Sequence, residues 1–163
     1  MRWNELREEP CPVARGLSVI GDRWTVLVLR DLFLGQRRFE PIRERLGCAR
    51  HILSDRLKKL EAAGVVERRP YQERPVRYEY RLTEAGKAFH AVLVSLIAWA
   101  ERYAPAEPSS ITLVDRDTGE KVDPVLIDRK SGREITHRSI RAKPQAASGR
   151  LERPLPSQAG SNS

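Results

Sequence analysis

One short segment, ARHILSDRLKKLEAA (residues 49–63), carries leucines at helical spacing within an otherwise polar stretch. Leu53, Leu57 and Leu60 follow one another at steps of four and three residues, so a helix would place them on one stripe. Gly64 ends the pattern. A helix of this kind buries its stripe against the rest of a domain and leaves its opposite face, here polar and mostly basic, open to a partner.

Three helices are expected before this segment and one after it. Pro12 suits the first position of a helix that stops at Gly21. Asp22 can cap the next helix, which is apolar on most sides and should lie at the centre of the core. Thr83 can cap the last helix. The expected ranges are 12–21, 23–34, 40–46 and 84–104.

Two strands are expected between the helix at 49–63 and the last helix. They cover residues 65–69 and 77–82, where Tyr78, Tyr80 and Leu82 alternate on one face. The connection PYQERPV is basic and contains two prolines, so we expect a projecting loop rather than a tight turn. This order predicts a mainly helical chain with a small β-hairpin (α+β), in the arrangement of a winged helix-turn-helix.

The positive charge of the chain is concentrated on these central elements. The formal net charge is +8, and 13 basic against 7 acidic residues lie between Gln36 and Arg81. A basic segment of this kind suits a polyanion such as DNA or RNA. A merely solvated basic surface is the alternative.

The fold and the charge together favour DNA. The major groove of B-DNA is about 12 Å wide and admits one helix, so the polar face of the helix at 49–63 would read base edges while its stripe holds it on the domain. We expect double-stranded DNA to contact Arg37, Arg38, Arg50, His51, Ser54, Asp55, Lys58, Arg74 and Arg77. An RNA-binding module, or a protein-interaction module without regulatory DNA binding, remains an alternative.

Five motifs in order give the chain a family resemblance. They are CPV (11–13), IGDRWTVLVLRDL (20–32), GQRRFEPIRERL (35–46), LSDRLKKLEAAGVVERR (53–69) and VRYEYRLTEAGKAF (76–89). In these the chain resembles the HxlR family of bacterial transcriptional regulators, which are relatives of the MarR type. It departs from the usual pattern at Ala49, where the family has a Ser or Thr cap, and at Pro41-Ile42, where it has a Glu-Leu pair.

The resemblance implies a homodimer with one winged helix per subunit that binds a near-palindromic operator. By family, the helix at 49–63 is the recognition helix, the 70–77 loop is the wing, and the subunits pair through their first and last helices. The last helix also has more apolar surface than a small core can cover. We expect the dimer contact to include Leu17, Ile20, Phe89, Leu93, Leu96, Trp99 and Tyr103.

Cys11 is a candidate redox sensor. The cysteine of the CPV motif senses oxidants or electrophiles in some members of the family, and Cys11 matches it. Pro12 would place Cys11 at a helix N-cap, where the helix dipole and Arg15 favour the reactive thiolate. Alternatively, Cys11 is an inert packing residue at the dimer contact. Cys48, just before the recognition helix, is expected to be buried.

The last third of the chain contains a repeat. LVDRDTGEKV (113–122) and LIDRKSGREI (126–135) match at an offset of 13 residues, and each reads as a hairpin with glycine at its turn. We therefore expect a winged-helix domain over 1–104, a double β-hairpin extension over 105–141 and a disordered tail over 142–163. The extension lacks the paired cysteines of a zinc ribbon and the spacing of an EF-hand, so we expect no metal and no cofactor.

Other classes of protein fit the sequence poorly. His51, His90 and His137 are scattered, and the Ser and Cys residues have no base at a recognisable spacing, so we do not expect an enzyme. The sequence contains no run of 18 apolar residues and its first residues lack a secretory pattern, so we expect a cytoplasmic protein without membrane spans. A small-molecule or redox effector is compatible with this reading.

Overall fold

A computed structural model describes residues 3–104 and 110–143. The chain divides into two compact units, with the boundary between Pro124 and Val125. Within the described residues, none of the helices combines the length and the hydropathy that a bilayer crossing requires. The elements, all in the first unit, are α1 (Trp3–Leu6), α2 (Pro12–Ile20), α3 (Arg23–Phe33), α4 (Phe39–Leu46), α5 (Arg50–Ala62), β1 (Val66–Glu73), β2 (Val76–Leu82), α6 (Glu84–Ala88) and α7 (His90–Tyr103).

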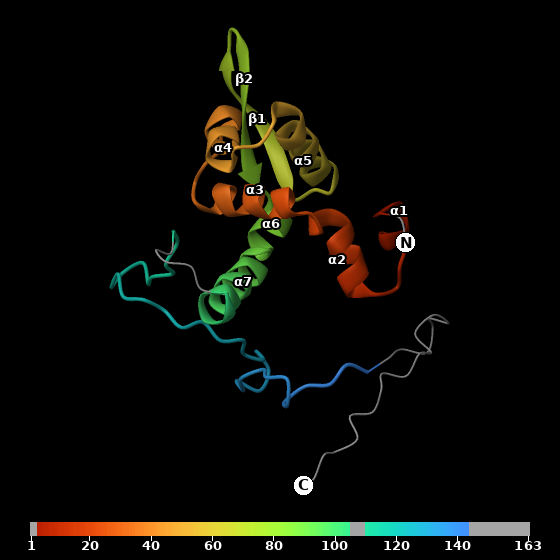
Figure 1. Cartoon of the computed structure of the whole chain (residues 1–163), viewed down its shortest axis with the longest axis vertical. Coiled ribbons are helices and arrows are strands. Elements are labelled where there is room, and N and C mark those ends of the chain that lie inside the picture. Colours follow the sequence, from red (N-terminus) through yellow and green to blue (C-terminus); the bar gives the residue numbers. More distant parts are fainter. Residues whose placement is uncertain (1–2, 105–109, 144–163) are drawn as a thin grey trace. The chain divides into compact units, whose positions relative to one another are not determined.

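This order confirms the mainly helical fold with one antiparallel hairpin. The helix α3 lies at the centre, with α4, α5 and the hairpin on one side and α6 and α7 on the other (Figure 1). The short helix α1 was not expected from the sequence. The expected last helix was wrong in one respect, because it is interrupted at Phe89 and forms α6 and α7.

Side-chain caps define the starts of α3 and α6. Asp22 Oδ1 accepts hydrogen bonds from the backbone N–H groups of Trp24 (3.0 Å) and Thr25 (3.1 Å) at the start of α3. The Thr83 hydroxyl accepts from the Gly86 N–H (3.2 Å) at the start of α6. Both caps were expected, since a side-chain oxygen at this position satisfies a backbone donor that the helix leaves free.

The core is formed by the buried faces of α3 and α5, one residue of α4, Cys48 in the turn before α5 and the first residue of β1. The leucine stripe of α5 is withdrawn from water and meets the buried face of α3, as the spacing predicted. Burial of one such side chain stabilises a fold by about 1.5–3 kcal/mol. The buried apolar residues of this cluster are Val28, Leu29, Leu32, Ile42, Cys48, Leu53, Leu57, Leu60 and Val66.

A buried carboxylate joins α3 to α4. Asp31 is fully buried, and its Oδ1 accepts from the Arg30 guanidinium at 2.8 Å. Its Oδ2 lies 3.5 Å from Nε of Arg45 on α4. Because an unpaired buried charge is strongly destabilising, Arg30 compensates the carboxylate within α3, and the ion pair with Arg45 is the contact that reaches α4.

The hairpin corrects the expectation of a long loop over residues 70–77. The antiparallel ladder continues from Val66 opposite Leu82 to Glu73 opposite Val76, so only a tight turn at Arg74 and Pro75 is left. The register is irregular between Pro70 and Gln72. A proline is tolerated in a strand at an edge or at a bulge, and a two-stranded hairpin offers both. The wing is therefore a ribbon of paired strands.

A glycine allows α6 to approach the start of the hairpin. Gly86 is buried, and a Cβ atom there would lie 2.2 Å from the carbonyl oxygen of Val65. The Thr83 hydroxyl also donates to the Gly64 carbonyl at 2.6 Å. The turn after α5 and the start of α6 are thus held together by close backbone packing.

Each repeat of the extension forms a turn closed by a single bridge. Asp115 Oδ1 accepts from the N–H groups of Asp117 (3.0 Å) and Thr118 (2.8 Å), and these bonds, that of Thr118 first, lower the pKa of the Asp115 carboxyl. Asp128 repeats the turn in the second unit, where the Ser131 hydroxyl donates to its carboxylate at 2.6 Å and lowers its pKa. The bridges pair Val114 with Lys121 and Ile127 with Glu134.

The expected division into three domains remains a prediction. The sequence suggested an extension that starts at residue 105, whereas the first repeat belongs to the compact unit that ends at Pro124. The expected disordered tail, 142–163, lies outside the described residues from 144 onward.

The buried face of α3 gives a test of the core. Replacing Leu29, which is fully buried, by alanine should lower the free energy of unfolding by about 2–5 kcal/mol, through lost burial and the cavity left behind. The matched control is Leu34→Ala just after the same helix, where the side chain is 48% exposed and the cost should stay within about 0.5 kcal/mol. Denaturant titration measures both, and equal costs would contradict this description of the core.

Candidate nucleic-acid interface

The outer face of α5 and the hairpin form one basic surface in the first unit. Figure 1 shows the hairpin extending beyond the ends of α4 and α5. Of the residues expected to contact DNA, Ser54 is half-buried and the others are exposed. They come from the turn before α4, from α5 and from the hairpin tip: Arg37, Arg38, Arg50, His51, Asp55, Lys58, Arg74 and Arg77.

The first turn of α5 has no side-chain cap. Ala49 occupies the N-cap position and offers no oxygen to the free backbone N–H groups. A contact from α4 holds this end instead, because Arg50 Nη2 donates to Glu40 Oε1. The Arg50 guanidinium also lies over the Phe39 ring, 5.0 Å from its centroid.

Glu40 binds two arginines. Arg43, one turn further along α4, donates from Nε to Glu40 Oε2 at 2.8 Å. The hydrogen bond from Arg43, together with the charge of Arg50, lowers the pKa of the Glu40 carboxyl below its ordinary value. Glu40 is therefore ionised at neutral pH and offsets part of the positive charge at the start of α5.

Asp55 is paired within α5 itself. Its Oδ2 lies 3.1 Å from Nη1 of Arg56 and 3.2 Å from Nζ of Lys59. Arg56 also approaches the helix-capping carboxylate of Asp22, with 3.1 Å between Nε and Oδ1. Asp55 thus orients cations on the helix, and Arg56 connects α5 to the start of α3.

Two arginine side chains stack on tyrosine rings of the hairpin. The Arg38 guanidinium lies 4.5 Å from the ring centroid of Tyr71, and that of Arg68 lies 4.2 Å from the ring centroid of Tyr78. Such stacking holds a guanidinium in place while its N–H groups stay free to donate. Tyr71, Tyr78 and Arg68 were not among the residues expected at the DNA face, although RRPYQERPVRYEYR (68–81) is rich in arginine and tyrosine.

A groove of about 700 Å³ separates the hairpin from the starts of α4 and α5. Arginines and aromatic rings dominate its lining, and Glu40 is its carboxylate. The lining residues are Arg38, Phe39, Glu40, Pro41, Arg50, Tyr71, Val76, Arg77, Tyr78 and Tyr80.

An apolar stripe runs along the outside of α7. Val92, Leu96, Trp99 and Tyr103 are between 46% and 66% exposed and follow one another at steps of four, three and four residues. This spacing is typical of helices that pack on another helix.

The other residues expected in a dimer contact divide into two groups. Leu17 on α2 is 45% exposed, and Val13 one turn before it is 68% exposed. Ile20 and Phe89 pack against the core of their own protomer, and Leu93 is buried there. The apolar surface of Ile20, Phe89 and Leu93 therefore packs within their own chain rather than facing a partner.

Cys11 is the N-cap residue of α2, as the sequence predicted, and its side chain is half-buried. Arg15 Nη1 donates to the carbonyl oxygens of Pro10 (2.7 Å) and Glu9 (3.2 Å), which keeps a positive charge beside this helix start. Cys48 is buried in the core, as expected.

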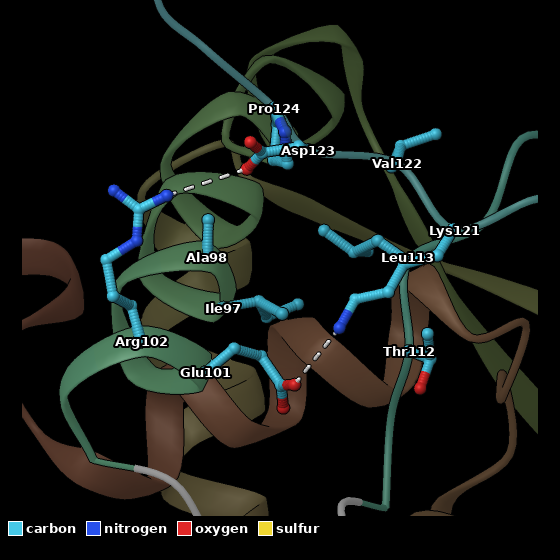
Figure 2. Close-up of a pocket in the computed structure, with 10 residues that line it drawn as sticks. All are labelled: Ile97, Ala98, Glu101, Arg102, Thr112, Leu113, Lys121, Val122, Asp123 and Pro124. Carbon is cyan, nitrogen blue, oxygen red and sulfur yellow. Dashed lines mark ion pairs between the residues drawn. The ribbon is translucent and has the colours of Figure 1, made fainter.

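A second hollow, of about 240 Å³, lies between α7 and residues 112–124 (Figure 2). Ile97 and Leu113 line its apolar side. Two ion pairs connect its walls, Arg102 with Asp123 at 3.8 Å and Glu101 with Lys121 at 3.9 Å. They attach the first repeat to α7. Among the described residues there is no group of three His, Cys, Asp or Glu side chains that could hold a metal ion.

Comparison with known proteins identifies this architecture. Residues 19–108 match the family model described as HxlR-like helix-turn-helix. The chain belongs to the HxlR family. The match includes α3 through α7 and thus the whole basic surface.

Several individual proteins are also similar to this chain. The HTH-type transcriptional regulator Rv3095 of Mycobacterium tuberculosis is 44% identical over 133 residues, which cover 81% of this chain and 84% of that protein. The solved structure of PA1607, named as a candidate transcription factor, is 36% identical with a TM-score of 0.76 and covers 86% of this chain and 99% of its own. The redox regulator HypR in its reduced form is 32% identical with a TM-score of 0.53, covering 56% of this chain and 91% of its own. The chain is thus a transcriptional regulator of the helix-turn-helix type.

Proposed function

We propose that the protein is a sequence-specific transcriptional regulator that binds a near-palindromic DNA operator as a homodimer in the cytoplasm. The observation that carries this proposal is the position of α5, whose leucine stripe is buried while its polar face stands open beside a projecting basic hairpin. A helix exposed in this way can enter the major groove, and the hairpin then reaches the flanking backbone.

The exposed residues divide into two roles in this proposal. Arg50, His51, Ser54 and Lys58 on α5 carry donors and acceptors toward base edges. The arginines of the hairpin and of the turn before α4 contact phosphates, which position the protein without reading sequence. These phosphate contacts are Arg37, Arg38, Arg74 and Arg77, while Asp55 orients its neighbours Arg56 and Lys59.

The proposed dimer follows from the uncovered apolar surface. The stripe on α7 and the exposed residues of α2 would cover one another across a two-fold axis, in an isologous contact. A two-fold protein places two recognition helices one DNA turn apart, about 34–36 Å. This geometry is why a palindromic operator is expected.

We also propose that Cys11 makes operator binding sensitive to oxidants. HypR, which is described as a redox regulator, supports this by likeness. The Cys11 thiolate would attack a peroxide, break its O–O bond and form a sulfenic acid with release of hydroxide, so that sulfur loses two electrons and peroxide gains them. The added group beside α2 would change the spacing of the two recognition helices and weaken binding.

DNA binding is tested with a duplex selected by the protein from a random pool. Arg50→Ala or Ser54→Ala should weaken binding to the selected duplex by about 1–3 kcal/mol and binding to a shuffled duplex much less. If about 6–10 phosphates are neutralised, affinity should fall by ~10³–10⁵ between 50 and 200 mM salt. Fluorescence anisotropy measures both effects. Lys87→Ala, which removes one cation from α6, is the control and should change neither.

Other outcomes would decide against this function. Retention on duplex RNA equal to that on duplex DNA would favour the RNA-binding alternative. If Arg50→Ala and Arg74→Ala together left salt-dependent retention on DNA unchanged, the basic surface would not be the DNA-binding face.

The dimer contact is tested at Trp99, the third residue of the α7 stripe. Trp99→Asp places a charge in the proposed contact and should raise the dimer dissociation constant at least about 30-fold, the effect of losing a central aromatic contact of about 2 kcal/mol. Sedimentation velocity at micromolar concentration measures the change. Val114→Asp, at another exposed apolar residue outside the stripe, should leave the dimer intact. A wild-type protein that sediments only as a monomer would contradict the proposed dimer.

The redox response is tested by comparing the two cysteines. Cys11→Ser should keep operator binding but lose its sensitivity to hydrogen peroxide, because a hydroxyl does not form the sulfenic acid. Cys48→Ser is the control and should remain sensitive. Anisotropy with and without peroxide gives the readout. If wild-type binding ignores peroxide, Cys11 is a packing residue.

A further inference from the structure

The first residue of the recognition helix is restrained by a different helix. Arg50 begins α5, directly after an N-cap alanine that caps nothing. Its guanidinium donates through Nη2 to Glu40 on α4, ten residues earlier in the chain, and lies over Phe39. Because the side chain is still 70% exposed, it is restrained without being covered.

The acceptor for Arg50 is itself held in place. Glu40 Oε2 accepts from Arg43 on the same face of α4, so the carboxylate has one oxygen for each arginine. Two guanidinium groups around one carboxylate leave one net positive charge. The start of α5 therefore attracts phosphate less strongly than its count of arginines suggests.

We propose that Glu40 is a positioning residue that sets the sequence specificity of this regulator through Arg50. This inference rests on the proposed DNA-binding function and adds to it. Glu40 uses an Nη2 donor of Arg50, and the other N–H groups belong to a side chain that is 70% exposed. Guanine offers two acceptors, O6 and N7, to such a pair of donors in the major groove.

Glu40 also disfavours non-specific contacts of Arg50. A free arginine can reach any nearby phosphate, and each phosphate neutralised adds about 0.9 to the slope of log affinity against log salt. To contact a phosphate, Arg50 has to break its charge-assisted hydrogen bond to Glu40. A guanine in register with the held guanidinium requires no such loss, so Glu40 favours the correct base over random DNA.

The test is the specificity ratio, defined as the dissociation constant for a shuffled duplex divided by that for a duplex selected by the wild-type protein. Glu40→Gln keeps the size of the side chain and removes its charge. It should lower the ratio by about 10-fold and steepen the salt slope on the shuffled duplex by about 0.9. In an Arg50→Ala background the same change should alter the ratio less than about two-fold, because the two residues act as one unit.

The control separates position from charge. Glu44→Gln removes the same charge one turn further along α4 and should leave the specificity ratio near the wild-type value. If Glu40→Gln and Glu44→Gln lowered the ratio equally, or if Glu40→Gln acted fully without Arg50, Glu40 would contribute only general charge and the inference would fall. If selection gave no preferred duplex at all, the proposed function itself would fail, and this inference with it.

Discussion

The packing of α5 against α3 determines what the surface of this protein can present. Leu53, Leu57 and Leu60 are inserted into a close-packed cluster with the buried face of α3, and packing of this density leaves a helix one rotational setting about its axis. That setting turns Arg50 and Lys58 toward solvent. Smaller side chains at the leucine stripe would let α5 rotate about its axis. The basic residues would then no longer lie on one common face, although all of them would still be present.

Carboxylates are placed among the cations of the basic surface. Glu40 pairs with Arg50 at the start of α5 and with Arg43 on α4, and Asp55 pairs with Arg56 and Lys59 further along α5. Since phosphate attraction alone gives affinity for any DNA, a surface that restrains its cations gains selectivity at some loss of non-specific binding. Tyrosine rings restrain Arg38 and Arg68 in the same way.

The helix α2 connects two proposed properties of the regulator, redox sensing and dimer contact, to its core. Cys11 forms its start, Leu17 lies on its exposed apolar face, and Gly21 ends it directly before the Asp22 cap of α3. A chemical change at Cys11 would act on a helix that belongs to the proposed dimer contact and leads without a loop into the core. In the proposed dimer, a small rotation there would misalign the two recognition helices relative to half-sites one turn apart.

The sequence by itself determined the helices α2 to α5 and the buried faces of α3 and α5. Helical spacing, the Asp22 and Thr83 caps and Pro12 at the start of α2 depend on residues within a turn or two, so they can be recognised locally. Only the tertiary structure decided the length of the hairpin, the interruption at Phe89 and the contact between Glu40 and Arg50. Each of these features depends on how segments distant in sequence meet. The hairpin is as long as its two strands stay paired in register, and the position of α6 depends on close packing between Gly86 and Val65. The ion pair between Glu40 and Arg50 depends on the path of the turn that joins α4 to α5.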